Sequence, residues 1–236
     1  MTLKAILFGS IGAIAETSEM QRNAFNGAFA EHGLDWHWDG PTYRNMLTIN
    51  GGRNRLEHHA KQTGTDLDDA TVAALHDTKT RLFDEAMKRD GLPLLPGVAR
   101  LLAQAREAGL KTGFVTGTVR ANIEALAQAT GLDLDAFDIV TDKTSVDAEK
   151  PDPAIYRHAC ARLGIDPVEA VAIEDSGSSL RSAVDAGCIT VAAPGANSGG
   201  QDFSAADLTV ASLDDVELRD LQALAAQLRV SSIAAE

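Results

Sequence analysis

The sequence predicts an α/β fold in which a parallel sheet, covered by helices on both faces, carries an inserted all-helical domain. Two observations lead to this prediction. Short apolar runs recur along the chain and, from Thr112 onward, alternate with stretches of helical periodicity. Strands buried on both faces read as continuous apolar runs, and intervening helices make the sheet parallel. A long helical stretch separates the first apolar run from the second, which indicates an insertion after the first strand.

Each apolar run is expected to form a strand that ends in a small or polar residue. The expected strands are Ala5–Phe8, Thr112–Thr116, Ile139–Thr141, Ala170–Glu174, Thr190–Ala193 and Leu208–Val210, with helices at Ala121–Ala129, Ala154–Leu163 and Leu180–Ala186. In such sheets ligands bind beyond the carboxyl ends of the strands. Gly9, Thr116 and Asp175 fall at or just past such ends, so we expect the site there.

The insertion is expected to contain several helices. Apolar residues recur with a helical period over Glu19–His32 and again between Val72 and Met87. The segment Gly91–Gly97, rich in proline and glycine, ends the insertion and leads into a helix of the core. We therefore expect residues 1–15 and 93–236 to form the core domain and residues 16–92 to form the helical domain.

The composition and net charge of the chain indicate which classes of partner it can bind. The chain has 236 residues, 44% hydrophobic and 23% charged, with a net charge of −13. Nucleic acids and anionic membrane surfaces need clustered Lys and Arg, so neither is expected as a partner. A phosphorylated small molecule remains compatible, because a local basic pocket is enough to bind it. Without a signal peptide or an apolar run of membrane-spanning length, we expect a cytoplasmic protein. No oligomeric state follows from the sequence.

One motif at a strand end suits a phosphate, and a second motif places a lysine before a helix. Thr116 and Gly117 end an apolar run before a helix, where a hydroxyl and backbone N–H groups can hold a phosphate oxygen. Taken alone, Thr116 is also compatible with a simple helix cap. Lys150 precedes a proline-opened helix in Glu149-Lys150-Pro-Asp-Pro, and taken alone it is compatible with an ordinary surface lysine.

Two adjacent carboxylates follow a buried strand. The run Ala172-Ile-Glu174-Asp175 delivers both acids into a turn, where they repel each other unless a cation lies between them. Carboxylate oxygens are the ligands that Mg²⁺ prefers. The alternative is that Asp175 caps the helix that starts near Ser178. The cysteines Cys160 and Cys188 show no metal-binding spacing and are expected to be buried, reduced thiols.

These motifs together resemble those of the haloacid dehalogenase-like (HAD) hydrolases, over nearly the whole chain. The resemblance implies a Rossmann-like core with a helical cap of the phosphoglucomutase-like branch. It also implies a first motif Asp-x-Asp-Gly-Thr, whose first Asp is the nucleophile and whose second is the general acid/base. The chain instead reads Ala5-Ile-Leu-Phe-Gly9-Ser-Ile11-Gly-Ala13, so Gly9 and Ile11 occupy the catalytic positions and Ala13 replaces the Thr.

The resemblance also assigns roles to the remaining motifs. It implies that Thr116, Gly117 and Lys150 bind phosphate, and that Asp175, supported by Glu174, binds Mg²⁺ together with the backbone carbonyl of Ile11. One metal-binding carboxylate is absent at position 9. We therefore expect Mg²⁺ to bind weakly or only with a ligand present.

Further segments resemble the CbbY-type sugar-bisphosphate (xylulose bisphosphate) phosphatases. They are Leu34–Asp39, Thr42–Arg44, Gly51–Arg55 and Glu124–Leu126. The resemblance implies that Arg44, Arg53 and Lys79 on the cap contact a second phosphate of the substrate. It also places Gln21 where the family usually has a histidine that contacts substrate.

Three other features are set aside. His58 and His59 diverge by about 100° on a helix and make a poor metal pair. His76 suits a helix surface better than a catalytic base. Ser10 lies one position from the nucleophile, but the sequence shows no His–Asp relay to activate it.

Three functions remain compatible with the residues. The first is a catalytically silent relative of the HAD phosphatases that binds a phosphorylated sugar, because glycine cannot attack phosphorus and isoleucine cannot transfer a proton. The second is an active Mg²⁺-dependent hydrolase with rerouted chemistry, recruiting Glu16 or Glu174, or an altered version of an active phosphatase. The third is a structural or interaction protein with a vestigial pocket. A phosphatase assay separates the second from the others, and ligand binding separates the first from the third.

Overall fold

The computed structural model describes residues 2–49, 51–195, 197–198 and 200–233, and the chain divides into two compact units. The core unit comprises Met1–Glu16, Pro93–Gly195 and Gln201–Glu236. The helical unit comprises Thr17–Leu92 and Ala196–Gly200. Each unit has its own buried apolar cluster.

The core unit is built on a parallel sheet, which confirms the predicted fold class. Its six strands, counted over the described residues, lie in the order β3-β2-β1-β4-β5-β6. Their bounds are β1 Ala5–Phe8, β2 Lys111–Val115, β3 Ile139–Thr141, β4 Ala170–Glu174, β5 Ile189–Ala192 and β6 Leu208–Thr209. All four residues of β1 are buried, because the strand is central and helices cover both faces of the sheet, which explains its unbroken apolar run.

Two expected strands are shifted by one residue. Strand β2 begins at the exposed Lys111 and β5 begins at Ile189, each one residue before the expected start. Lys111 belongs to the strand because its backbone pairs with Ala5, while its ammonium forms an ion pair with Asp138 at 2.8 Å. A polar side chain at a strand end leaves no apolar signal, so the sequence pattern missed this residue.

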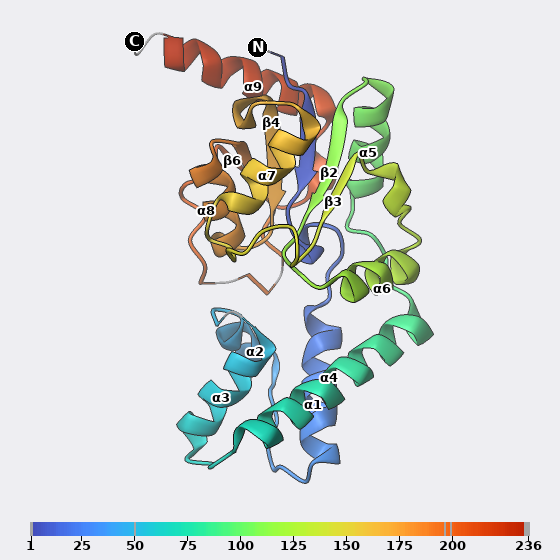
Figure 1. The fold of residues 1–236 in the computed structure, drawn as a ribbon, viewed down its shortest axis with the longest axis vertical. Coiled ribbons are helices and arrows are strands. Elements are labelled where there is room, and N and C mark those ends of the chain that lie inside the picture. Colours follow the sequence, from blue (N-terminus) through green and yellow to red (C-terminus); the bar gives the residue numbers. More distant parts are fainter. Residues whose placement is uncertain (1, 50, 196, 199, 234–236) are drawn as a thin grey trace. The chain divides into compact units, whose positions relative to one another are not determined.

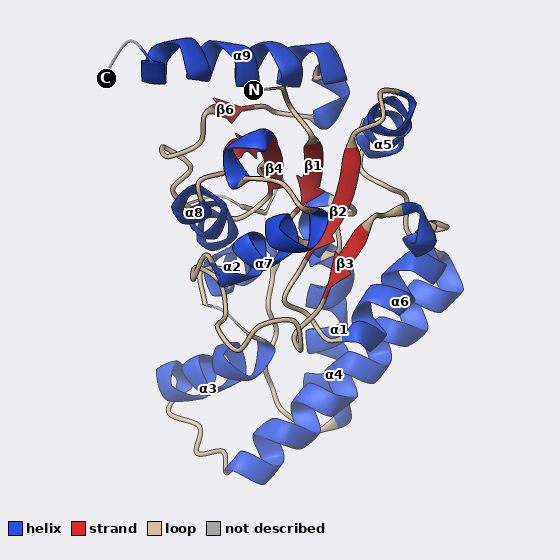
Figure 2. Cartoon of the chain, turned by 45° about the horizontal axis from the view of Figure 1, so that its top comes forward, coloured by secondary structure: helices blue, strands red, loops and turns tan. Residues whose placement is uncertain are grey.

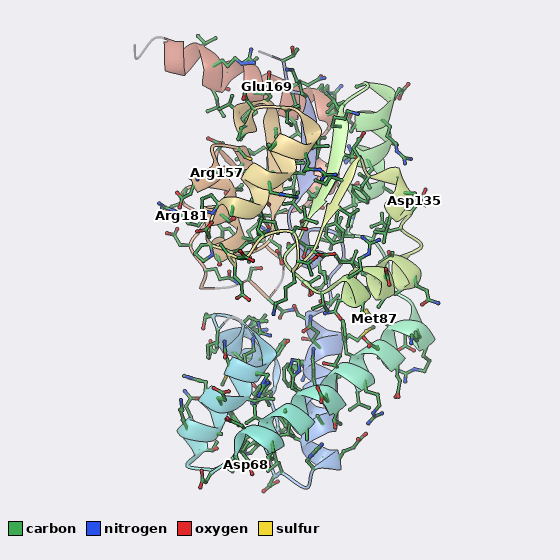
Figure 3. The ribbon with its side chains drawn as sticks, in the orientation of Figure 1. Asp68, Met87, Asp135, Arg157, Glu169 and Arg181 are labelled. Atoms are coloured by element: carbon green, nitrogen blue, oxygen red, sulfur yellow. The ribbon has the colours of Figure 1, made fainter. Side chains whose placement is uncertain are left out.

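Helices cover both faces of the sheet (Figures 1 and 2). They are α5 Val98–Glu107, α6 Arg120–Thr130, α7 Ala154–Leu163, α8 Gly177–Ala186 and α9 Leu218–Ile233. Helices α7 and α8 pack together on one face, while α5 packs against β2 and α9 on the other. Figure 3 labels Arg157 on α7, whose guanidinium donates to the carbonyl of Asp185 on α8 at 2.8 Å and ties the two helices together.

Over its described residues, the helical unit contains four helices between positions 17 and 92: α1 Ser18–Glu31, α2 Gly40–Met46, α3 Gly52–Thr63 and α4 Asp69–Asp90. Two of them begin at an aspartate cap. Asp39 accepts from the N–H of Thr42, and Asp68, labelled in Figure 3 at the start of α4, accepts from that of Thr71, both at 2.8 Å. These caps fix where the helices start.

An aromatic cluster forms the centre of the helical unit. The rings of Phe25, Phe29, Trp38 and Tyr43 lie at centroid separations of 4.8–6.2 Å, and at most 1% of each residue is exposed. This cluster explains the helical periodicity of α1, because Phe25 and Phe29 are one turn apart on the same face.

Among the described residues, no helix combines the length and apolarity that a bilayer crossing requires. Cys160 and Cys188 are both free and buried.

Candidate functional site

The candidate site lies at the carboxyl ends of three neighbouring strands of the core unit. Gly9 follows β1, Thr116 follows β2, and Glu174 ends β4. Strands β1 and β4 are neighbours, although the chain leaves β1 toward β2 and reaches β4 from β3 on the opposite edge. Such a reversal opens a crevice at the strand ends, which is where ligands bind in open α/β sheets.

The space beside Gly9 is filled by two other side chains. Its N–H donates to the carbonyl of Ile173 at 2.9 Å, which continues the pairing of β1 with β4. A Cβ atom at position 9 would lie 1.9 Å from the hydroxyl oxygen of Tyr156 and 2.1 Å from Oε1 of Glu174. Any side chain at this position therefore requires Tyr156 and Glu174 to move.

Lys150 joins the three strand ends. Its ammonium donates to the carbonyl of Gly9 at 2.5 Å, to the carbonyl of Val115 at 3.1 Å and to Oε1 of Glu174 at 2.7 Å. A lysine ammonium has three N–H donors, so these contacts use all of them. It also lies 4.8 Å from the ring centroid of Tyr156. Lys150 thus holds β1, β2 and β4 together in this conformation.

Glu174 and Tyr156 form a buried polar pair. The Tyr156 hydroxyl donates to Oε1 of Glu174 at 2.5 Å, and neither residue is exposed to solvent. Burial raises the pKa of Glu174, although the nearby ammonium of Lys150 opposes the shift. Burial, reinforced by the Glu174 carboxylate, raises the pKa of Tyr156 well above its ordinary value. Within the described residues, Oε2 of Glu174 has no hydrogen-bond partner.

Asp175 lies against the turn that follows Gly9. The hydroxyl of Ser10 donates to Oδ1 of Asp175 at 2.5 Å and itself accepts from the N–H of Ala13 at 3.2 Å. A Cβ atom on Gly12 would lie 1.8 Å from Oδ2 of Asp175, so only glycine permits this close approach. Burial raises the pKa of Asp175, while the Ser10 hydroxyl bond lowers it.

The alternative role of Asp175 as a helix cap is not what the structure shows. Helix α8 is capped by Ser176, whose side chain accepts from the N–H of Ser179 at 3.4 Å. Asp175 precedes the cap, and its carboxylate bonds back to Ser10. The sequence allowed both arrangements because aspartate and serine are comparable caps.

Ile11 opens a short 3₁₀ helix, η1 Ile11–Ala13, immediately after Ser10. Its carbonyl oxygen, a predicted metal ligand, accepts from the N–H groups of Ile14 and Ala15, both at 2.9 Å. A carbonyl oxygen has two lone pairs, and these two backbone bonds use both of them.

Thr116 and Gly117 lie in the loop between β2 and α6. Thr116 is 5% exposed, and its hydroxyl accepts from the N–H of Thr118 at 3.3 Å. Gly117 is exposed, and a Cβ atom there would meet only Ile155, at 3.9 Å. The structure thus gathers Thr116, Lys150, Glu174 and Asp175 around the strand ends, as expected from their motifs.

The four remaining candidates belong to the helical unit, where two of them touch. Lys79 on α4 donates to Oε1 of Gln21 on α1 at 3.3 Å, and Gln21 in turn donates to Thr17 at 2.9 Å. Arg44 lies on α2 and is half-buried, whereas Arg53 at the start of α3 is exposed. No bond between either arginine and the Gln21–Lys79 pair occurs in the described part of the chain.

Lys79 is a buried cation. Only 8% of it is exposed, and its ammonium lies 5.2 and 4.9 Å from the ring centroids of Phe25 and Phe83. Over the described residues, no carboxylate pairs with it within 4.0 Å. Burial lowers the pKa of Lys79 to about 8, and the charge of Arg55 adds to this shift. The sequence did not predict this burial, because a single lysine in a helix usually faces solvent.

Sequence reasoning missed three residues of the site. Tyr156 was visible six positions after Lys150, but nothing in the sequence indicated that its hydroxyl would reach position 9. For Ser10 the sequence indicates only a place beside the nucleophile position, whereas the structure shows that its hydroxyl donates to Asp175. Gly12 matched the glycine of the first motif, and the structure gives the physical reason for it: its missing side chain leaves room for Asp175.

Known proteins resemble this chain in sequence and in structure. The sequence model of the haloacid dehalogenase-like hydrolases matches residues 3–187. Protein CbbY of Rhodobacter capsulatus is 40% identical over 215 residues, which are 90% of this chain and 95% of that protein. The CBBY-like protein of Arabidopsis thaliana is 32% identical over 86% of this chain and 67% of its own length.

Among solved structures, a mutant of CbbY from Rhodobacter sphaeroides in complex with xylulose-(1,5)bisphosphate superimposes with a TM-score of 0.83 at 36% identity, covering 94% of this chain and all of that one. The same protein in complex with phosphate gives a TM-score of 0.82 at 36% identity, over 94% of this chain and 99% of that one. The family profile, the relatives and the shared fold agree: this chain belongs to the haloacid dehalogenase-like hydrolases.

Proposed function

We propose that this protein binds a phosphorylated sugar and does not hydrolyse it by the route of its family. The observation that carries the proposal is the filled space at position 9, where the hydroxyl of Tyr156 and the carboxylate of Glu174 lie within 2.1 Å of any Cβ atom. If the space beside position 9 were empty, an aspartate side chain would still fit there. In this structure Tyr156 and Glu174 fill that space.

The chemistry lost at positions 9 and 11 supports a silent site. The family route needs one carboxylate to attack phosphorus and a second to protonate the leaving oxygen and activate water. Gly9 has no side chain, and the alkyl side chain of Ile11 cannot exchange a proton. Loss of a covalent nucleophile costs roughly four to six orders of magnitude in rate, and residues that act as a unit are lost together.

The remaining groups suit a bound phosphate that is not attacked. The Thr116 hydroxyl, the exposed backbone at Gly117 and the turn from Ser10 to Ala13 offer neutral donors near the strand ends. Lys150 adds positive charge, but its three donors already bond to the protein. We therefore assign Lys150 an electrostatic role unless a ligand displaces one of its three bonds.

A sugar with two phosphates is the ligand class that the relatives favour. The CbbY structures hold xylulose-(1,5)bisphosphate and phosphate, in a protein that is 36% identical to this one. On the helical unit, we propose Arg44, Arg53 and Lys79 for the second phosphate. We propose Gln21 for contact with the substrate, at the position where the family usually has a histidine. Lys79 suits an anion because it is a buried ammonium whose bonded partner is a neutral amide.

Titration calorimetry with xylulose-1,5-bisphosphate tests the proposal. Thr116→Val keeps the shape of the side chain and removes the hydroxyl, so we expect affinity to fall by about tenfold. Arg53→Gln should weaken the bisphosphate more than a monophosphate. Arg106→Gln, an exposed residue on α5, is the matched control and should bind like wild type. Absence of binding at millimolar ligand would refute the proposal and favour a structural or interaction role.

One observation favours rerouted hydrolysis as a second candidate. The carboxylate of Glu174 lies next to position 9, and its Oε2 atom has no partner among the described residues. In that case Glu174→Gln would abolish a measurable phosphatase activity of the wild type. Wild-type protein without activity on a generic phosphate ester, with or without Mg²⁺, would exclude this candidate.

A further inference from the structure

The family generally uses Mg²⁺, and in this chain the groups at the expected ligand positions already have other partners. At position 9 the metal-binding carboxylate is replaced by glycine. The carbonyl of Gly9 accepts from Lys150 at 2.5 Å, so a protonated amine occupies the acceptor that remains there. Mg²⁺ demands close to six oxygen ligands in octahedral array at about 2.1 Å, which requires acceptors free to approach it.

The second ligand position is used by the backbone. The carbonyl oxygen of Ile11 accepts from the N–H groups of Ile14 and Ala15, each at 2.9 Å. The bond from Ile14 closes the 3₁₀ turn that follows Ser10, and the bond from Ala15 spans one residue more. For a cation to bind this oxygen, the turn would have to open, and two buried N–H groups would lose their acceptor.

The third position, Asp175, is bonded to a hydroxyl donor. Ser10 donates to Oδ1 at 2.5 Å, a short distance of the kind made by O–H groups to a charged oxygen. Ser10 is held in this orientation because its hydroxyl oxygen accepts from the N–H of Ala13. The donor that faces Asp175 is therefore part of the protein and is positioned by the turn.

We propose that the pocket works without a divalent metal, because the hydroxyl of Ser10 takes the place of the cation on Asp175 and Lys150 supplies the positive charge to Glu174. Ser10 is thus a positioning residue, and the phosphate ligand binds independently of Mg²⁺. Within the described residues, no group of three or more His, Cys, Asp or Glu side chains is arranged to hold a metal ion. Oε2 of Glu174 is a buried carboxylate oxygen without a partner there, and one such oxygen does not make an octahedral site.

Direct metal binding tests this inference without reference to any ligand. Mn²⁺, which accepts the same oxygen ligands as Mg²⁺, is titrated into the full-length protein and followed by electron paramagnetic resonance. Because the chain carries a net charge of −13, Asp175→Asn is the control that separates binding at the site from binding to the acidic surface. We expect wild type and Asp175→Asn to give the same titration.

Variants at Ser10 test its assigned role. Ser10→Ala removes the hydroxyl that donates to Oδ1 of Asp175, so Mn²⁺ affinity at the site should rise by about tenfold, the equivalent of one hydrogen bond to a charged group. Ser10→Thr keeps the hydroxyl and should behave like wild type. Saturable Mn²⁺ binding by wild type that Asp175→Asn abolishes would overturn the inference. If Ser10→Ala titrates like wild type, the hydroxyl is not what excludes the metal, and the role of Ser10 is wrong.

The statement that phosphate binds independently of Mg²⁺ rests on the proposed function. Inorganic phosphate is titrated calorimetrically into wild type in EDTA and again in excess MgCl₂, and the two dissociation constants should agree within about twofold. A loss of affinity of about tenfold or more in EDTA would contradict metal independence. No binding of phosphate in either solution would instead refute the proposed function, while the Mn²⁺ titration would still decide the metal question.

Discussion

The hydroxyl oxygen of Tyr156 lies 1.9 Å from the place that a Cβ atom would take on Gly9. Tyr156 is on α7 and Gly9 follows β1, so two segments far apart in the sequence compete for one small volume. The Tyr156 hydroxyl is fixed there by its bond to Glu174, which in turn accepts from Lys150. The glycine and the network around it are therefore parts of one arrangement, and the predictions below follow from it.

A side chain at position 9 should destabilise the core unit. Gly9→Ala places a methyl group against Tyr156 and Glu174, so we expect a loss of about 1–3 kcal/mol in the free energy of unfolding. Adding Tyr156→Phe removes the closest atom and should recover part of that loss. Urea denaturation measures both effects. Gly117→Ala is the matched control, because its Cβ atom would meet only Ile155 at 3.9 Å; equal losses at positions 9 and 117 would show that the space at Gly9 is not filled.

On the proposed function, aspartates introduced at positions 9 and 11 should give only partial hydrolysis. In Gly9→Asp/Ile11→Asp the new nucleophile must displace Tyr156 and Glu174, so we expect low activity on a generic phosphate ester with Mg²⁺. The triple variant that adds Tyr156→Phe should be faster by about tenfold or more, because the nucleophile can then reach a productive geometry. A triple variant as inactive as wild type would place the defect elsewhere.

Removing only one charge of the Lys150–Glu174 pair should lower the free energy of unfolding more than removing both charges. Lys150→Met leaves a buried carboxylate without its cation and removes the hydrogen bonds to the carbonyls of Gly9 and Val115. The free energy of unfolding should therefore fall by roughly 3–5 kcal/mol. Lys150→Met/Glu174→Gln removes both charges and should be more stable than the single variant. Chemical denaturation of the four proteins of this double-mutant cycle gives the coupling energy, and additive losses would mean that the pair is not coupled.

Lys79 should make the stability of the helical unit depend on pH. Burial lowers the pKa of Lys79 from 10.5 to about 8, so between these values the unfolded chain binds more protons than the folded one. The free energy of unfolding should therefore rise by roughly 3 kcal/mol from pH 8 to pH 10.5 through this group and stay level below pH 8. In Lys79→Met that rise should be missing and stability at pH 7 should be higher.

Tryptophan fluorescence is the suitable measurement for Lys79, because both tryptophans, Trp36 and Trp38, belong to the helical unit. Urea titrations of wild type and Lys79→Met at several pH values give the difference that belongs to this residue. If the free energies of unfolding of wild type and Lys79→Met differ by the same amount at every pH from 7 to 10.5, the ammonium of Lys79 is solvated rather than buried.

The core strands, their parallel sheet and the helical insertion were predictable because hydrophobic periodicity indicates them. Buried strands such as β1 and β4 are apolar throughout, and the motif residues Thr116, Lys150, Glu174 and Asp175 come directly after or between such runs. In a parallel sheet the strand ends meet at one edge, so sequence position alone brought these residues together.

What the sequence could not predict are the contacts that depend on side-chain reach. The hydroxyl of Tyr156 at position 9 and that of Ser10 on Asp175 follow from three-dimensional packing of α7 and of the η1 turn. The burial of Lys79 between Phe25 and Phe83 likewise depends on how α1 and α4 pack. Hydroxyls and lysines leave no periodic signal, so these partners appear only in the structure.

The most direct test of the central claim is ³¹P NMR of a sugar bisphosphate with and without the wild-type protein, in the presence of Mg²⁺. The account predicts that the protein broadens or shifts the ligand signals and that no inorganic phosphate signal grows over many turnover times of an active phosphatase. Steady growth of inorganic phosphate that depends on Glu174 would show that the site is catalytic. Ligand signals unchanged by the protein would show that it does not bind this class of molecule.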